Sequence, residues 1–171
     1  MHNAVKANGT TGILRIISRE GFGADCVSGG EIEAAVHAGF RPADIFFAGV
    51  GKTDSEIELG LRQGIGCFNV ESLEELRIIA SIAESCGIKA PVALRINPNI
   101  DAHTHHYITT GLEENKFGIS ADDMEEGVRI CMDNAWLRLR GLHFHIGGQI
   151  TAMEPFKILC ERINGYRLIQ W

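Results

Sequence analysis

Short apolar segments alternate with amphipathic helical patterns along nearly the whole chain, and this alternation constrains the fold more than any other feature. The apolar segments begin about every 20 to 25 residues until a longer connection follows Asn97. They lie at 3–8, 23–28, 44–49, 66–70, 92–97 and 140–147. The helical patterns lie at 11–20, 29–39, 54–63, 72–86, 121–133 and 151–164. Repeated strand–helix units with apolar strands predict a parallel sheet that is covered by helices.

Two of these helices carry capping residues. Ser72 stands three residues before Glu75, which predicts a capping box ahead of the apolar stripe in 73–82. Gly39 follows the pattern of 29–38 and is suited to the residue just past a helix end.

Ionisable side chains stand among the apolar residues of several predicted strands. Successive side chains of a strand point to opposite faces. In GLHFHIG, His143 and His145 therefore share one face, opposite the leucine, phenylalanine and isoleucine. Lys6 in AVKA, Asp25 in GADCVS and Arg95 in VALRIN occupy similar positions. Burying such groups is costly, on the order of several kcal/mol, unless each finds a partner, so their convergence predicts a site.

The same polar face bears on the architecture. An open doubly wound sheet buries uniformly apolar strands, whereas the interior mouth of a (β/α)8 barrel carries ionisable groups. We therefore predict an α/β fold, a partial (β/α)8 or TIM barrel with about six of its eight strand–helix units. Residues 1–171 are expected to form this one incomplete domain of a larger protein.

Composition sets broader bounds. The chain has 171 residues, of which 45% are hydrophobic, and a formal net charge of −6, which argues against nucleic acid as a partner. The five cysteines are scattered and form no CxxC pair, as is typical of reduced thiols. No segment approaches the length of a membrane span or a signal peptide. We expect a cytoplasmic protein without a membrane partner.

Two patterns suggest other chemistry. AGVGKTD, at 48–54, follows a strand and opens a helix, but Phe46 stands where a phosphate-binding P-loop requires glycine. His143 and His145, with the histidines of DAHTHHY, could bind zinc, but the chain shows no inward carboxylate to complete such a site. We therefore expect neither nucleotide hydrolysis nor a metal, and assign His145 as an aromatic or hydrogen-bonding partner of an organic cofactor.

Lys6 is the strongest candidate for covalent chemistry. A lysine in a strand ordinarily points to solvent, but a lysine desolvated in a barrel can attack a carbonyl. Pyridoxal phosphate is the commonest aldehyde that awaits such a lysine. Arg95 and Asp25 would then orient the ring, and Gly147 and Gly148 would bring backbone amides close to the phosphate.

Seven stretches together resemble the fold type III pyridoxal-phosphate decarboxylases, and the diaminopimelate decarboxylase branch in particular. They are AVKAN, GADCVSGGE, FAGVGKTDSEI, FNVES, ALRINPN, DAHTHHYITTGLEENKFGI and GLHFHIGGQI, in family order over residues 4 to about 160. HTHHYITTG followed by NKFGI and HFHIG favours this branch over ornithine or arginine decarboxylases. The resemblance implies a barrel of the alanine racemase-like type followed by a C-terminal β-domain, which this sequence lacks.

The resemblance also implies roles for individual residues. Lys6 would carry pyridoxal 5′-phosphate covalently, His145 would stack on its ring, and Arg95 and Asp25 would line its pocket. Gly147 and Gly148 match the turn beside the phosphate. Glu31 matches an acidic position near the active site, and Lys116 a position near the subunit interface of a homodimer. The implied reaction is decarboxylation of meso-2,6-diaminopimelate to L-lysine and CO₂, the last step of lysine biosynthesis by this route.

The sequence also departs from the family pattern. Asn3 stands where the family usually has an aromatic residue, and Gly148 where it usually has serine, which removes a hydrogen bond worth about 1 kcal/mol. The later glycine-rich phosphate segment, the carboxylate that pairs with the ring nitrogen and the β-domain are missing. We therefore expect the isolated chain to be inactive. Another type III decarboxylase of basic amino acids or carboxy-polyamines, a non-catalytic cofactor-binding remnant and a misfolding segment stay open as alternatives.

Overall fold

The computed structural model describes residues 1–98, 117–147 and 150–166. A strand or a helix lies in each interval where the sequence predicts one. The strands are β1 (His2–Ala4), β2 (Gly23–Cys26), β3 (Ile45–Phe47), β4 (Cys67–Val70), β5 (Ala90–Arg95) and β6 (Leu137–His143). The helices are α1 (Thr11–Arg19), α2 (Gly29–Ala38), α3 (Asp54–Gln63), α4 (Leu73–Cys86), α6 (Met124–Asp133) and α7 (Glu154–Gly165). Short 3₁₀ helices cover Val5–Ala7 and Pro42–Asp44.

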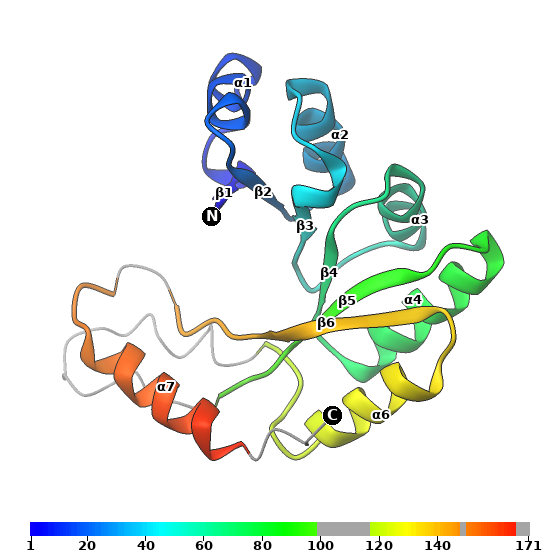
Figure 1. Ribbon diagram of the computed structural model, residues 1–171, viewed down its shortest axis with the longest axis vertical. Coiled ribbons are helices and arrows are strands. Elements are labelled where there is room, and N and C mark those ends of the chain that lie inside the picture. The colour runs from blue at the N-terminus through cyan, green and yellow to red at the C-terminus, as the bar shows by residue number, and fades with distance from the viewer. Residues whose placement is uncertain (99–116, 148–149, 167–171) are drawn as a thin grey trace.

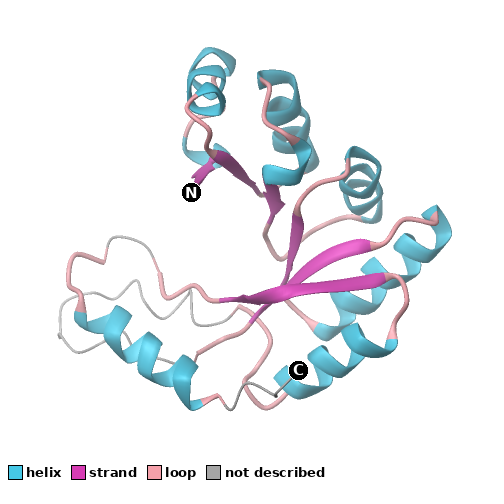
Figure 2. Ribbon diagram, viewed as in Figure 1, coloured by secondary structure: helices cyan, strands magenta, loops and turns pink. Residues whose placement is uncertain are grey.

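The six described strands form one parallel sheet in the order β1-β2-β3-β4-β5-β6 (Figure 1). A doubly wound sheet would reverse its strand order at a switch point, and this order never reverses. Because crossovers between parallel strands are right-handed, an unreversed order places the connecting helices on one face of the sheet. Helix α1 packs on α2, α2 on α3 and α3 on α4, as an arc around the strands (Figure 2). The fold is therefore α/β and matches a partial (β/α)8 barrel.

The hydrophobic core lies between the sheet and this helical arc. Alternate strand residues point to it and are fully buried, including Cys26 on β2, Phe47 on β3, Phe68 on β4 and Leu94 on β5. The residues between them face the other side of the sheet, which we call the inner face. Asp25 is one of these residues, and it is only partly buried. The helices thus stabilise one side of the sheet and leave the inner face for polar groups.

A β-bulge in β6 decides which of its side chains reach the inner face. Val92 pairs with Leu139, but the next residue of β5, Ala93, pairs with Gly141, so Arg140 is the extra residue. After the bulge, Leu142 packs on the core and His143 lies opposite Arg95. The bulge therefore turns His143 toward the inner face.

The observed helix caps agree in part with those predicted from the sequence. Gly39 has a left-handed φ of 96° at the end of α2, as predicted. The Ser72 side chain accepts a hydrogen bond from the Glu75 backbone N–H at the start of α4, which confirms half of the predicted capping box. The full capping box lies instead on α3, between Thr53 and Glu56.

Within the described part of the chain, no helix combines the length and apolar character that spanning a bilayer requires.

Candidate functional site

Polar side chains gather where the parallel strands end. In a parallel sheet all carboxyl ends lie along one edge, which is the usual place of the active site in barrel enzymes. Lys6 follows β1, Asp25 lies in β2, Arg95 is the last residue of β5 and His145 follows β6. The structure thus places these four predicted site residues at one edge of the sheet. Gly148 lies outside the described residues.

Lys6 lies in the 3₁₀ helix that follows β1, so the prediction of a strand over 3–8 is wrong beyond Ala4. The backbone turns because the Asn8 N–H donates to the Val5 carbonyl and the Asn8 side chain accepts from the Thr10 N–H at 3.0 Å. Val5 is buried, whereas Lys6 is exposed. The described chain therefore presents the Lys6 amine to solvent, without the desolvation that the barrel argument expected.

Asp25 connects the two ends of the site. Burial raises the pKa of its carboxyl group, while the nearby positive charges of Lys6, His2 and His145 lower it. His145 follows β6, four strands away from β2 in the sheet order. A sheet of the barrel type curves, and this curvature accounts for the end of β6 lying within electrostatic range of the end of β2.

Glu31 lies in the first turn of α2, and Gly147 lies in the segment that follows β6. The Glu31 carboxylate accepts a hydrogen bond of 2.8 Å from the Val27 N–H at the start of α2, and its charge helps to raise the pKa of Asp25. Gly147 has a φ of 113°, a conformation that favours glycine. Both residues lie beside the site, Glu31 within electrostatic range of Asp25 and Gly147 in the turn after His145.

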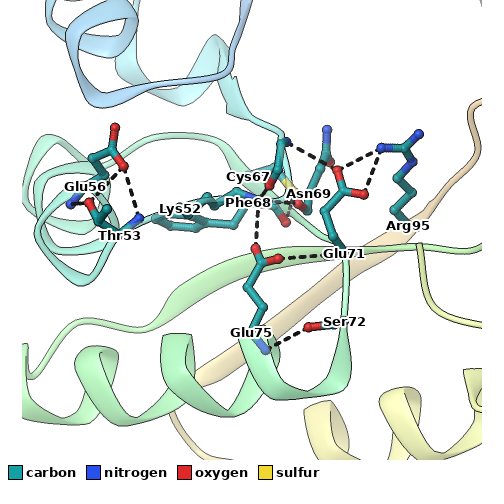
Figure 3. A network of polar contacts seen from close by, with 11 residues as sticks. Lys52, Thr53, Glu56, Cys67, Phe68, Asn69, Glu71, Ser72, Glu75 and Arg95 are labelled. Atoms are coloured by element: carbon teal, nitrogen blue, oxygen red, sulfur yellow. Dashed lines mark hydrogen bonds and ion pairs between the residues drawn. The ribbon is translucent and has the colours of Figure 1, made fainter. Parts of the chain in front are cut away.

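Arg95 is held by a carboxylate that the sequence analysis did not select. Its Nη1 donates to both oxygens of Glu71, at 2.9 Å and 2.8 Å (Figure 3). The Arg95 side chain is 12% exposed and the Glu71 side chain 4%. On the other side Arg95 is paired in register with His143. The Nδ1 atom of His143 is buried without a hydrogen-bond partner among the described residues.

Lys52, which the sequence analysis considered only for a P-loop, is a second buried cation. Its Nζ donates to the carbonyls of Gly49 and Asn69, at 2.7 Å and 2.8 Å, and to the Glu75 carboxylate at 2.7 Å. Its side chain is 1% exposed. The lysine therefore ties the β3–α3 connection to β4 and α4, instead of reaching out toward a phosphate (Figure 3).

A cavity of about 470 Å³ lies beside this network. Its wall includes Lys52, Glu71 and Glu75, together with exposed Glu74 and Phe117. Lys6, Asp25 and His145 do not line this cavity, whereas Glu71, which binds Arg95, does. The sequence signal for Glu71 was the FNVES stretch, in which a carboxylate directly follows a strand.

The histidines of DAHTHHY lie outside the described residues. The rest of the chain, as far as the structure describes it, contains no group of three or more His, Cys, Asp or Glu side chains that could hold a metal ion. Burial raises the pKa of Cys26 and Cys131 to about 12 and that of Cys67 to about 11, so these three thiols are protonated at neutral pH.

Comparison with known proteins gives a consistent result. Residues 1–167 match the family model described as "Pyridoxal-dependent decarboxylase, pyridoxal binding domain". The chain is 56% identical over 164 residues to a diaminopimelate decarboxylase of Bacteroides thetaiotaomicron and 48% identical over 162 residues to one of Pseudomonas aeruginosa. These matches cover 96% and 95% of this chain but only 42% and 39% of the relatives. The chain thus spans about two fifths of their length.

Solved structures agree with the sequence relatives. A diaminopimelate decarboxylase of M. jannaschii in complex with L-lysine superposes with a TM-score of 0.87 at 36% identity, over 96% of this chain and 38% of that one. The Helicobacter pylori enzyme, also complexed with L-lysine, gives 0.82 at 46% identity, over 94% and 43%. An arginine decarboxylase of Paramecium bursaria Chlorella virus, at 23% identity and a TM-score of 0.75, shares the fold.

Proposed function

The chain belongs to the pyridoxal-dependent decarboxylase family, and on that premise we propose that its inner face binds pyridoxal 5′-phosphate for the decarboxylation of an amino acid. The observation that carries the proposal is the position of Lys6. Lys6 is exposed and lies just after the end of β1, and both Lys6 and His145, which follows β6, lie within electrostatic range of Asp25. The Lys6 amine and the His145 imidazole thus both act electrostatically on the same carboxyl group, that of Asp25.

The chemistry of these groups fits the cofactor. A lysine amine can bind an aldehyde, and an imidazole ring offers a flat surface to a pyridine ring. His143 adds a buried nitrogen that lacks a partner among the described residues. When bound, pyridoxal phosphate supplies the electron sink for the electron pair that the departing CO₂ leaves behind.

Each residue then has a defined task in the proposal. Lys6 binds the aldehyde and releases it when the substrate amine takes its place. His145 supports the ring from one face, and Asp25 balances the charge of Lys6. Arg95 presents its guanidinium to the pocket, and Gly147 and Gly148 offer backbone amides to the phosphate.

We further propose meso-2,6-diaminopimelate as the substrate and L-lysine as the product of the whole protein. The support is that relatives at 56% and 48% identity are diaminopimelate decarboxylases and that two similar solved structures hold L-lysine. By the same reasoning the whole protein would act in the cytoplasm as a homodimer.

The cofactor proposal can be tested directly on the 171-residue chain. Pyridoxal phosphate is added, the visible absorbance is recorded, borohydride is applied, and peptide mass mapping locates the trapped group. We expect trapping at Lys6 in the unchanged chain and none at that position in Lys6→Ala. Lys89→Ala is the matched control, because Lys89 is also exposed but precedes β5 at the opposite edge of the sheet. Trapping spread evenly over several lysines would contradict the proposal.

The substrate proposal needs the remaining part of a relative. In a chimera, the 164 matched residues of this chain replace the corresponding segment of the Bacteroides thetaiotaomicron enzyme, to which they are 56% identical. We expect CO₂ release from meso-diaminopimelate and none after Lys6→Ala. A chimera that binds pyridoxal phosphate at Lys6 yet prefers ornithine or arginine would contradict the substrate but not the cofactor.

A further inference from the structure

We infer that Glu71 is a positioning residue that fixes the guanidinium of Arg95 at the cofactor site, and that Lys52 holds Glu71 in place through Glu75. This inference rests on the proposed function, since it assumes that the inner face receives the cofactor. It concerns Glu71 of the β4–α4 connection, Glu75 of α4 and Lys52 of the β3–α3 connection, none of which is a predicted site residue.

The first step is the orientation of Arg95. Glu71 directly follows β4, and Val70 of that strand is paired with Leu94, so Glu71 lies beside Arg95. Both carboxylate oxygens accept from the same guanidinium nitrogen, at 2.9 Å and 2.8 Å. The Glu71 carboxylate also accepts from the Gly49 N–H at 3.3 Å. Three contacts from two directions leave the carboxylate little freedom to move, and Arg95 is fixed with it.

The second step is the support of Glu71. Its backbone N–H donates to the Glu75 carboxylate at 3.0 Å, and that carboxylate accepts from Lys52 Nζ at 2.7 Å. Lys52 also donates to the carbonyl of Asn69, two residues before Glu71. The end of β4 is therefore held from the helix side by Lys52 and Glu75 (Figure 3). A cation stands at each end of this chain of contacts, Lys52 beside Glu75 and Arg95 beside Glu71, and the Glu71 backbone N–H links the two carboxylates.

The third step is an energetic argument that the network fixes the orientation of Arg95 more than it stabilises the fold. The side chains of Lys52, Glu71 and Arg95 are 1%, 4% and 12% exposed. Burying paired charges is costly, and such pairs are often no more stabilising than apolar side chains of similar size. What they provide is a fixed geometry, since a carboxylate and a guanidinium restrict each other's orientation. The Arg95 end of the network is the one that reaches the inner face, beside His143.

A double-mutant cycle on cofactor affinity separates positioning from general support of the fold. Glu71→Gln, Arg95→Gln and the double variant are titrated with pyridoxal phosphate, and the Lys6-dependent absorbance gives each Kd. If Glu71 acts through Arg95, Glu71→Gln weakens binding about tenfold alone but adds nothing in the Arg95→Gln background. Glu74→Gln is the control. Glu74 lies beside Glu75 in the first turn of α4, but its side chain is 79% exposed. This variant should bind like the unchanged chain.

The outcomes are distinct. Effects of Glu71→Gln that are equal in both backgrounds overturn the inference while leaving the proposed function intact. Absence of Lys6-dependent absorbance in the unchanged chain contradicts the proposed function, and the inference falls with it. Thermal unfolding by circular dichroism shows which variants fold. If Glu71→Gln does not, the cycle is run with Glu71→Asp, which keeps the charge but draws the carboxylate back by one methylene.

Discussion

At the scale of single residues, His143 is the side chain whose environment has the clearest thermodynamic consequence. Burial, and next the positive charge of Arg95, lower the pKa of its imidazole from 6.5 to about 4. The folded chain therefore holds this histidine neutral, whereas the unfolded chain takes up a proton near pH 6.5. The stability that depends on neutral His143 is present above that pH and is lost as the pH falls toward 4.

We expect the free energy of unfolding to fall by about 2 kcal/mol between pH 7 and pH 4.5 because of His143, a value reduced for its partial exposure. Urea unfolding at both pH values measures this difference, and His143→Gln should remove most of it. His37→Gln serves as the control, because His37 is an exposed residue of α2. If both variants keep the full difference, the loss belongs to other titrating groups.

The residue scale also shows how far strand alternation can predict a site. It selected Lys6, Asp25, Arg95, His143 and His145. The structure places Asp25, Arg95 and His143 on the inner face, with Arg95 and His143 as register partners, whereas Lys6 and His145 lie just beyond their strands. It did not select Glu71 or Lys52. A glutamate after a strand is ordinarily the start of an exposed helix, and only the folded chain brings its carboxylate to an arginine 24 residues later.

At the scale of elements, helix α3 packs closely on strand β4 at Gly60. A Cβ atom there would lie 2.9 Å from Phe68 Cζ and 3.0 Å from Ile65 Cδ1. Phe68 is fully buried in β4 and cannot move aside. We expect Gly60→Ala to lower the free energy of unfolding by about 1 to 2 kcal/mol, since overpacking outweighs the better helix propensity of alanine.

Gly30 of α2 is the matched control, because a Cβ atom there would have no neighbour within 4 Å. Gly30→Ala should therefore raise stability by up to about 1 kcal/mol. Chemical denaturation of both variants tests the pair. A Gly60→Ala chain as stable as the Gly30→Ala chain would mean that α3 shifts away from β4 at little cost.

Element boundaries depended on contacts that sequence patterns do not contain. The S-x-x-E pattern at Ser72 predicted a capping box, but the Glu75 carboxylate binds Lys52 and the Glu71 N–H instead. The same pattern at Thr53 and Glu56 forms the full box, where the Glu56 carboxylate bonds back to its own N-cap residue. The difference at Ser72 comes from the buried cation Lys52, which belongs to the preceding strand–helix unit. Lys52 lies close to Glu75 only in the folded chain.

At the scale of the whole molecule, the alternation of strands and helices predicted a parallel sheet, but periodicity alone did not exclude a doubly wound order. The polar residues of the inner face made the distinction, because they belong inside a barrel. The observed order of six strands without reversal agrees with that argument. The curvature that brings His145 toward Asp25 arises from the twist and packing of the whole sheet, which no single segment encodes.

This curvature leads to a prediction about the cooperativity of cofactor binding. Among the described strands, β1 and β6 each pair with one neighbour, so they should open locally at a lower free energy than the central strands. Lys6 follows β1 and His145 follows β6, so pyridoxal phosphate bound to both would have to be released before either edge opens. At a concentration of 100 times its Kd, the ligand should stabilise the bound state by about 2.7 kcal/mol. Hydrogen exchange followed by mass spectrometry should then show slower exchange at both edges together.

Pyridoxine 5′-phosphate is the control ligand. It has the same ring and phosphate but no aldehyde, and it should protect β6 more than β1. Protection at only one edge with pyridoxal phosphate would mean that the cofactor does not bridge the two ends of the sheet.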